Sequence, residues 1–260
     1  MNEVNKTLYI PLYGKSEVSK KGILLNDPKA EEIWAKEGFA LKGKAKSKWL
    51  TYYMGMRSSV FDDWVRMQME EDSEAVILHL GCGLDSRAER IGHGDYLWYD
   101  VDFPEVIEER KKYYVETERY HMIGADVRDS EWLRQIPKGN AIIVMEGISM
   151  YLNAGELRDL MIRFNRYFVK VRLLMDCYTK FAAKASKYKN PINEVGVTNV
   201  YGYDAPEIMA RKTGLRFVKE HELTPEEKID ELQGFEKLFF KHVMGGSMAK
   251  KMYRLYEFEF

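Results

Sequence analysis

The chain has 260 residues, 45% of them apolar, which is enough for one α/β domain with a decorated end or for two small domains. Its 40 Lys and Arg residues nearly balance its 41 Asp and Glu residues, and the net charge of −1 excludes an overall attraction to nucleic acid or to an anionic membrane. No run approaches the ~18–20 apolar residues of a membrane span and no signal peptide is visible, so we expect a cytoplasmic protein in which Cys82 and Cys177 stay reduced.

The first part of the chain shows no strand-like alternation, and we expect a helical lid at residues 1–70 followed by an α/β domain at residues 71–260. A loop-rich start should lead to helices at residues 28–35 and 49–70, with a break or kink near Gly55. Between these helices a row of lysines alternates with small residues, which we interpret as a solvated basic face: Lys42, Lys44, Lys46 and Lys48.

The stretch at residues 76–102 should form the centre of the α/β domain. It contains an apolar strand at residues 76–80, the turn Gly81-Cys82-Gly83, a helix that begins near Asp85-Ser86, and a strand at residues 96–101 that leads to Asp102. A strand that feeds a glycine turn and a helix N-terminus is how open α/β sheets bind nucleotide-like ligands, because glycine lets the ligand touch the backbone. Asp102 then lies where a ribose diol needs two acceptors. The stretch predicts a site for an adenosine-containing cofactor.

Two residues distinguish between the possible cofactors. A dinucleotide fingerprint needs a third glycine where this chain has Ser86. Asp85 adds a negative charge at the helix N-terminus, where the pyrophosphate of NAD or FAD would lie. S-adenosylmethionine has no phosphate and carries an ammonium and a sulfonium, so it is the cofactor that this sequence favours.

The rest of the chain alternates strands with helices, which is typical of a doubly wound, Rossmann-like and mostly parallel sheet. Strands are expected at residues 121–124, 141–145, 171–177, 215–223 and 253–260, and helices at residues 104–120, 153–169, 206–213 and 225–245, the last interrupted near Gly234. We interpret the polar and aromatic residues 178–205 as a lid-like insertion. The last strand alternates strictly, which indicates a strand half exposed on one face. We expect this strand to be antiparallel, at the interior or the edge of the sheet.

Three carboxylates stand at or just after the ends of predicted strands: Asp102, Asp126 and Glu146. The carboxyl ends of parallel strands face one crevice, where three carboxylates would repel one another without a cationic or hydrogen-bond-donating ligand. The ribose hydroxyls, the adenine amine and the sulfonium–ammonium end of S-adenosylmethionine would each supply such a partner.

Seven segments together carry a family resemblance. They are IPLYGK at residues 10–15, NDPKAEEI at 26–33, RSSVFDDWV at 57–65, LGCGLDSR at 80–87, YDVDFPEV at 99–106, RYHMIGAD at 119–126 and EGISMY at 146–151. As a set they resemble the leucine carboxyl methyltransferase family, most of all its bacterial branch related to the tetracenomycin polyketide O-methyltransferases. This chain departs from the family at Ser86, where threonine is usual, and at Arg57-Ser58-Ser59, where Arg-Thr-Arg is frequent.

The resemblance implies a class I S-adenosylmethionine-dependent methyltransferase with a helical N-terminal lid. Arg57, with Lys15 as a second cation, would pair with the carboxylate of the cofactor. Asp102 would hold the ribose hydroxyls, Asp126 would meet the adenine amine, and Glu146 would face the methionine end near the sulfonium. The implied cofactor-binding set is Lys15, Arg57, Gly81, Gly83, Asp102, Asp126, Val127 and Glu146, and the implied catalytic residue, lining the acceptor pocket, is Tyr151.

The nature of the acceptor follows from the need for a base. A carboxylate acceptor is already ionised, whereas a phenol has a pKa near 10 and needs a general base. His79, His93 and His121 lie in predicted strands or a loop and are interpreted as structural, which favours a carboxylate, as the resemblance does. The lid and the insertion should shape the acceptor pocket, for which the candidate aromatic residues are Tyr52, Tyr53, Tyr151, Tyr201 and Tyr203.

We therefore expect an O-methyltransferase that acts on a small, polyketide-like molecule, with no metal, nucleic-acid or membrane partner. Three alternatives stay open: methylation of a protein C-terminus, an NAD-dependent oxidoreductase on a similar sheet, and a binding protein that keeps the fold without catalysis. The sequence makes no prediction of the oligomeric state.

Overall fold

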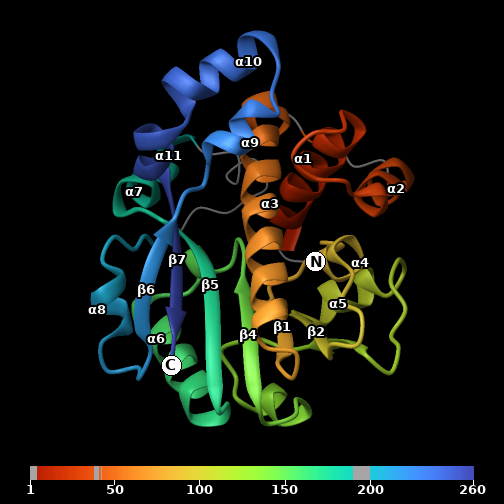
Figure 1. Cartoon of the computed structure of the whole chain (residues 1–260), viewed down its shortest axis with the longest axis vertical. Coiled ribbons are helices and arrows are strands. Elements are labelled where there is room, and N and C mark those ends of the chain that lie inside the picture. Colours follow the sequence, from red (N-terminus) through yellow and green to blue (C-terminus); the bar gives the residue numbers. More distant parts are fainter. Residues whose placement is uncertain (1–4, 38–40, 42, 190–199) are drawn as a thin grey trace.

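The computed structural model describes residues 5–37, 41, 43–189 and 200–260. Its described strands form a seven-stranded sheet in the order β3-β2-β1-β4-β5-β7-β6 (Figure 1). The strands are β1 (Val76–Leu80), β2 (Trp98–Asp102), β3 (Tyr120–Gly124), β4 (Asn140–Met145), β5 (Lys170–Tyr178), β6 (Arg216–His221) and β7 (Tyr253–Glu259). Strands β1 to β5 are parallel, and β7 lies antiparallel between β5 and β6. The predicted doubly wound, mostly parallel sheet with an antiparallel C-terminal strand is confirmed.

Helices cover the sheet and also gather beyond one of its ends, where Figure 1 shows α1, α9, α10 and α11. The α-helices are α1 (Tyr9–Lys20), α2 (Pro28–Glu37), α3 (Lys48–Glu71), α4 (Arg87–Ile91), α5 (Pro104–Arg110), α6 (Ala154–Tyr167), α7 (Lys180–Lys189), α8 (Pro206–Ala210), α9 (Glu226–Asp230), α10 (Gly234–Phe239) and α11 (Gly246–Met252). Short helices of other types are η1 (Asn5–Leu8), η2 (Gly43–Lys46), η3 (Glu131–Gln135), η4 (Ser149–Tyr151) and the π-helix η6 (Phe240–Met244). Within the described ranges, none of these helices has the length and apolar character needed to cross a membrane.

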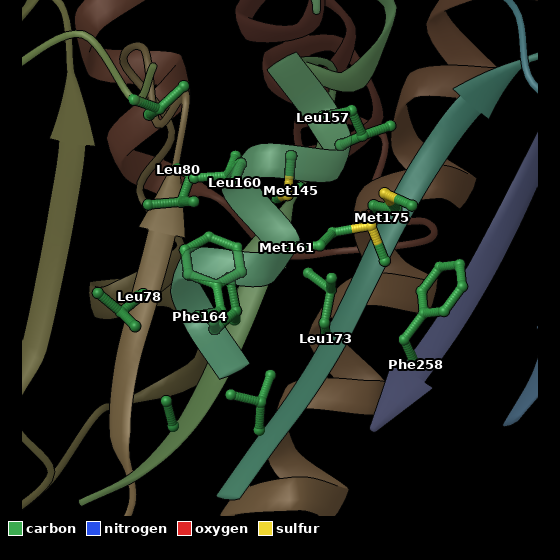
Figure 2. Close-up of a cluster of buried hydrophobic side chains, with 14 of the residues drawn as sticks. Leu78, Leu80, Met145, Leu157, Leu160, Met161, Phe164, Leu173, Met175 and Phe258 are labelled. Carbon is green, nitrogen blue, oxygen red and sulfur yellow. The ribbon is translucent and has the colours of Figure 1, made fainter. Parts of the chain in front are cut away.

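One face of the sheet is covered by α6. Phe164 and Leu160 of this helix belong to the same buried cluster as Leu78 of β1 (Figure 2). The helix begins with the predicted capping box, in which Asn153 accepts a hydrogen bond from the N–H of Glu156 and the Glu156 carboxylate accepts one from the N–H of Asn153. The cap and the apolar stripe together fix α6 on the sheet.

The opposite face is covered by α3. Phe61 and Trp64, in the second half of this helix, share a buried cluster with Ile77 of β1 and Val144 of β4. The first half of α3 extends past the carboxyl ends of the strands and contacts α1 (Figure 1). A single long helix therefore places Arg57, near its middle, at the carboxyl ends of the central strands.

Two expectations for the N-terminal part are wrong. Tyr9–Lys20 forms the helix α1 instead of a loop-rich start. Pro11 is compatible with this helix because it lies in the first turn, where backbone N–H groups have no intrahelical partner. Helix α3 has no break near Gly55. This glycine instead allows close packing, since a Cβ placed on it would lie 2.9 Å from Val18 Cγ2 and 3.0 Å from Leu24 Cδ1.

The contact between α1 and α3 gives a first testable prediction. A Cβ on Gly14 would lie 2.7 Å from Met54 Cβ, an atom fixed to the backbone of α3, so the two helices would have to separate. We expect Gly14→Ala to lower the free energy of unfolding by about 1–2 kcal/mol, since overpacking outweighs the gain in helix propensity. Gly139→Ala is the control, because a Cβ there meets nothing within 4 Å. Urea unfolding compares the two variants, and equal stabilities would contradict the close packing.

Three differences concern the later elements. Helix α5 ends at Arg110 and not at residue 120; the Arg110 guanidinium donates to the buried Asp100, and the chain then turns back to β3 at Tyr120. Strand β7 is not half exposed: it lies between two strands, and its Glu257 is buried within 2.6 Å of His221 Nε2. Part of the predicted insertion forms α7, and its residues 190–199 lie outside the described residues.

The basic stretch behaves as expected where it is described. Lys46 and Lys48 are exposed, and Lys48 Nζ lies 3.0 Å from Glu236 Oε1. Lys42 lies outside the described residues. Lys48 therefore forms an exposed ion pair with α10, and Lys46 lies over the ring of Tyr13 in α1.

Candidate active site

A cavity of about 800 Å³ opens where the carboxyl ends of the central strands meet α1 and α3. Its volume is in the range of small-molecule sites. All eight residues predicted to bind the cofactor lie on its wall, together with the predicted catalytic residue Tyr151: Lys15, Arg57, Gly81, Gly83, Asp102, Asp126, Val127 and Glu146. The fold thus brings the predicted set together, and the role of each member in binding stays a prediction.

The glycine turn after β1 and the end of β2 form one wall. Gly81 and Gly83 have φ angles of +67° and +51°, which favour glycine. Asp102 Oδ2 accepts a hydrogen bond from the N–H of Gly83, and Oδ1 accepts one from the N–H of Phe103, both at 2.8 Å. Each oxygen keeps one lone pair for a further donor. Burial raises the pKa of Asp102 to about 6, although the two N–H groups oppose this shift.

Arg57 is held between two carboxylates. Its Nε donates to Glu146 Oε1 at 2.9 Å, and its Nη1 donates to Asp176 Oδ2 at 2.8 Å. Ser58 donates to the same oxygen of Glu146 at 2.8 Å, and the N–H of Gly147 donates to Asp176 Oδ1 at 2.7 Å. Among the residues that the structure describes, no hydrogen bond uses Arg57 Nη2. A ligand carboxylate can therefore bind this guanidinium without displacing Glu146 or Asp176.

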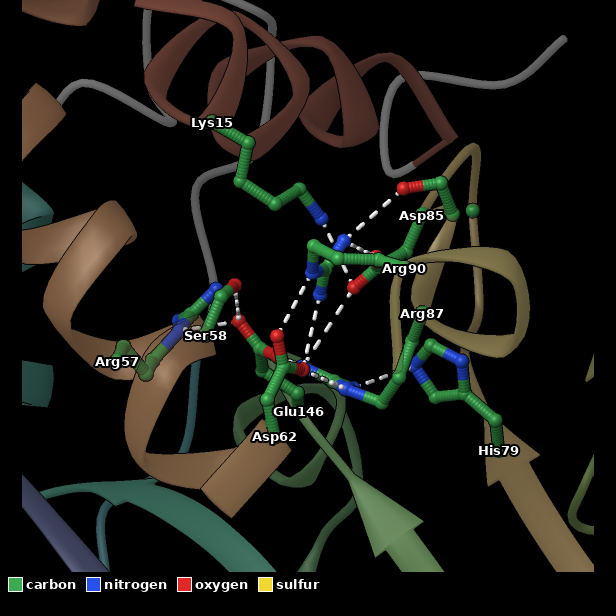
Figure 3. Close-up of polar contacts among 12 residues, drawn as sticks. Lys15, Arg57, Ser58, Asp62, His79, Asp85, Arg87, Arg90 and Glu146 are labelled. Atoms are coloured by element: carbon green, nitrogen blue, oxygen red, sulfur yellow. Dashed lines mark hydrogen bonds and ion pairs between the residues drawn. The ribbon is translucent and has the colours of Figure 1, made fainter. Parts of the chain in front are cut away.

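The ion pairs continue from Glu146 along the buried side of the cavity (Figure 3). Arg87 is fully buried; its Nη2 donates to Glu146 and its Nε donates to Asp62 Oδ1 at 2.8 Å. The same guanidinium lies 3.2 Å from Nε2 of His79. Arg87 therefore links α4, α3 and the ends of two strands.

A second arginine carries the network to α1 (Figure 3). Arg90 Nη1 lies 2.7 Å from Asp27 and 2.9 Å from Asp85. Its Nε donates to Asp62 at 2.7 Å, and Lys15 Nζ of α1 lies 2.8 Å from Asp85. Lys15 thus lies at the cavity wall as the ion-pair partner of Asp85. From the sequence, Asp85 was expected only to disfavour a pyrophosphate.

The cations keep the key acids of the network ionised. Burial alone would raise the pKa of Glu146, but Arg87 and Arg57 outweigh burial and hold this pKa well below its usual range. The same balance between burial and neighbouring cations holds the pKa of Asp85 well below its usual range. At Asp176 burial prevails over Arg57, and the pKa of this carboxyl is raised.

Negative groups outnumber positive groups in the network. Within the described part of the chain it contains five carboxylates and four cations: Asp27, Asp62, Asp85, Glu146 and Asp176 with Lys15, Arg57, Arg87 and Arg90. No side chain among them is more than 7% exposed, so water screens their charges weakly. The unbalanced charge favours a ligand with a net positive charge.

Asp126 lies on the cavity wall but already has a cationic partner. Both of its oxygens lie 2.9 Å from Arg128 Nε, and Oδ1 also accepts the N–H of Arg128 at 2.9 Å. The Arg128 side chain lowers the pKa of Asp126. Val127, which stands between these two residues in the sequence, is buried and lines the cavity. The predicted adenine contact requires Asp126 to share its carboxylate with Arg128.

The tyrosines of the cavity differ in part from those expected. Tyr151, in η4, donates to Thr7 Oγ1 at 3.3 Å, and burial raises its pKa, so it serves as a hydrogen-bond donor at neutral pH. Tyr53 also lines the cavity, whereas three other candidates do not: Tyr52, Tyr201 and Tyr203. Tyr178 and Tyr253 line it instead, because β5 ends and β7 begins beside it.

His79 and Cys82 line the cavity without offering a reactive group. Burial lowers the pKa of His79, and its Nε2 faces the Arg87 guanidinium, so the lone pair of this nitrogen is occupied. Burial raises the pKa of the Cys82 thiol well above its usual value. Both residues therefore remain neutral at physiological pH.

Sequence reasoning missed most of the buried network. Asp62, Arg87 and Arg90 gave no separate signal, although Asp62 and Ser58 stand four residues apart on one face of a helix that is otherwise apolar there. Asp176 was hidden inside an apolar strand, one residue before its predicted end. It follows the same pattern as Glu146, an acid at the carboxyl end of a parallel strand, and that pattern could have identified it.

Comparisons with known proteins agree with this architecture. A family model described as Leucine carboxyl methyltransferase matches residues 13–164. The tetracenomycin polyketide synthesis O-methyltransferase TcmP of Streptomyces glaucescens is 35% identical over 164 residues, which cover 62% of this chain and 61% of that protein. The S-adenosyl-L-methionine-dependent methyltransferase dpfgK of Gibberella zeae is 29% identical over 182 residues, covering 63% and 61%. The chain spans about three fifths of the length of the curated relatives it matches.

Solved structures share the fold at low sequence identity. A SAM-dependent methyltransferase from Anabaena variabilis has a TM-score of 0.52 and 13% identity, covering 78% of this chain and 83% of its own. Magnesium protoporphyrin IX methyltransferase from Synechocystis, solved with bound SAH, has a TM-score of 0.50 and 11% identity, covering 94% and 96%. At these identities the likeness describes the arrangement of strands and helices alone.

Proposed function

The chain belongs to the leucine carboxyl methyltransferase family, and on this premise we propose that it is an S-adenosylmethionine-dependent O-methyltransferase that methylates a carboxylate of a small, polyketide-like molecule. The observation that carries the proposal is the shared cavity, in which Arg57, Asp102 and Glu146 line one space beside the glycine turn although they come from distant segments. The relative TcmP, a polyketide synthesis O-methyltransferase, supports the class of acceptor.

The residues of the cavity fit this cofactor. S-adenosylmethionine carries an ammonium, a sulfonium and one carboxylate, and its net positive charge offsets the excess of one carboxylate in the buried network. Arg57 Nη2 and Lys15 would hold its carboxylate, and Glu146 would face the methionine end. The free lone pairs of Asp102 would accept the two ribose hydroxyls. When bound, the cofactor supplies an activated methyl group.

A carboxylate is the acceptor that this cavity can use without a base. Among the described residues that line it, the only histidine is His79, whose Nε2 is occupied by Arg87. Burial raises the pKa of Tyr53 to about 12, so this hydroxyl stays protonated, and Arg87 and Arg57 hold the pKa of Glu146 well below its usual range, which makes it a weak base; neither can deprotonate a phenol efficiently at neutral pH. The chain's own residues would then align the acceptor and exclude water.

Calorimetry tests the cofactor. We expect S-adenosylhomocysteine to bind the full chain at micromolar concentrations, because it shares the adenosine, carboxylate and ammonium groups that the cavity residues are suited to hold. NADH, whose pyrophosphate would meet Asp85 and Glu146, should give no heat of binding under the same conditions. No binding of S-adenosylhomocysteine up to millimolar concentration would refute the proposal.

A chemical test identifies the acceptor group. The chain is incubated with methyl-labelled S-adenosylmethionine and with pairs of aromatic carboxylic acids and the corresponding phenols. A methyl ester releases its label as methanol in mild base, whereas a methyl ether keeps it. Base-stable label on the phenols alone would overturn the carboxylate assignment and leave the methyltransferase assignment in place.

A further inference from the structure

A row of methionines from η6 and α11 lines one part of the cavity. Met244, Met248 and Met252 recur every four residues through η6 and α11, and all three line the cavity. Met248 is 46% exposed and Met252 is 37% exposed, so core packing does not account for their apolar side chains. We call these three residues the methionine row.

The backbone beneath the row is anchored at both ends. The carbonyl of Met244 accepts a hydrogen bond from the hydroxyl of Tyr53 in α3. The carbonyl of Met252 accepts one from the N–H of Thr179 at 3.2 Å, and the Thr179 hydroxyl donates to the carbonyl of Lys251 at 2.6 Å. Flexible side chains therefore extend from a fixed backbone, an arrangement suited to adaptable contacts with a ligand.

The walls near the row are aromatic or small. Figure 1 shows α7 and α11 on the opposite side of the molecule from β2, and the two helices contact each other. Helix α3 contributes Trp49 and Tyr53 to the cavity, and α7 contributes Ala182 and Ala185, whose short side chains leave room beside the row. This part of the cavity thus combines aromatic rings, thioethers and free space.

Charged groups are confined to the other part of the cavity. Its described lining includes three cations, and each already has an acidic partner: Lys15 with Asp85, Arg57 with Glu146, and Arg128 with Asp126. None of them belongs to α7, η6 or α11. The part of an acceptor that lies along α7, η6 and α11 therefore meets no charged side chain among the described lining residues, which favours an uncharged, apolar body.

We propose that the methionine row is the specificity-determining surface for the acceptor, and that it receives the flat body of an aromatic carboxylic acid with two or more rings. Thioether sulfur makes favourable contacts with aromatic rings, and the unbranched side chain adapts to their outline. The proposal rests on the proposed function, since it assumes that the carboxylate lies at the cofactor end. It adds the residues that select the acceptor and the class of molecule they select.

The test uses 2-naphthoate as the probe, titrated by calorimetry into the full chain saturated with S-adenosylhomocysteine. In the double variant Met248→Gln/Met252→Gln the side chains keep their length but become polar, and we expect about tenfold weaker binding of naphthoate. Met248→Leu/Met252→Leu should bind within about threefold of the wild type, because it keeps an apolar wall. Val243→Gln is the matched control: Val243 is 48% exposed on η6 but does not line the cavity.

The outcomes separate this inference from the proposed function. Wild-type affinity for naphthoate in the Gln double variant, or an equal loss in Val243→Gln, would overturn the assignment of the methionine row. S-adenosylhomocysteine alone, and naphthoate without S-adenosylhomocysteine, are also titrated into the wild type and the same variants. If it fails to bind the wild type while naphthoate binding still depends on the row, the row is supported and the methyltransferase proposal falls.

Discussion

Arg87→Met is expected to lower the free energy of unfolding by about 3–5 kcal/mol, because it removes one member of a buried ion network and leaves charges behind. Arg87 is fully buried and donates to Glu146 and to Asp62. Methionine matches most of its length but cannot satisfy either carboxylate. Urea unfolding of the variant and the wild type measures the loss.

The control for this prediction is an exposed pair. Arg134 Nη1 lies 2.7 Å from Glu131, with side chains that are 75% and 68% exposed, and Arg134→Met should change stability by less than about 0.5 kcal/mol. Adding Glu146→Gln to Arg87→Met should recover part of the loss, since the buried network then has one unbalanced carboxylate fewer. Equal stabilities of the Arg87 and Arg134 variants would show that the network contributes nothing to folding.

The affinity for S-adenosylhomocysteine should fall as the pH drops below about 6. Burial raises the pKa of Asp102 to about 6, and a protonated carboxyl loses the acceptor capacity that two ribose hydroxyls need. A single proton limits the change to about tenfold per pH unit below the pKa. Calorimetry between pH 5 and pH 7 should give an affinity that rises to about pH 6 and then levels off.

Asp102→Asn provides the comparison. The variant should bind S-adenosylhomocysteine more weakly by ~1–3 kcal/mol, with no pH dependence from this position. The stability of the ligand-free protein should change in the opposite sense: a carboxyl whose pKa is raised by folding contributes stability near pH 4, which is lost as the pH rises through about 6. A wild-type affinity that stays constant from pH 5 to pH 7 would contradict the assignment of Asp102 to the ribose.

The sheet was predictable because its signals are local. Apolar runs such as residues 141–145, glycine at Gly81 and Gly83, and the capping box at Asn153 each act within a few residues, and the alternation of strands and helices then limits the topology. The helix α1 was missed for the opposite reason. Pro11 and Gly14 usually interrupt helices, and only the position of Pro11 in the first turn and the close approach of α3 to Gly14 make them compatible with one.

The site residues at the strand ends could be predicted from the sequence, whereas the buried ion pairs behind them could not. Asp102, Asp126 and Glu146 follow from where parallel strands end, and their placement on one cavity wall agrees with that reasoning. The pairing of Arg87 with Asp62, or of Arg57 with Asp176, joins residues 25 and 119 positions apart, and no local pattern specifies such a pair. The family resemblance supplied Arg57 and Lys15, but their pairing with Glu146, Asp176 and Asp85 appears only in three dimensions.

The buried ion network has a consequence for how ligands enter and leave. Movement of α1 away from the sheet would break the buried ion pair between Lys15 and Asp85, so opening the cavity on this side is energetically costly. The rim formed by α7 and α11 is fastened by hydrogen bonds from Thr179 and presents apolar side chains instead of ion pairs. We therefore expect the cofactor and the acceptor to enter and leave the cavity beside α7 and α11, while the N-terminal helices stay in place.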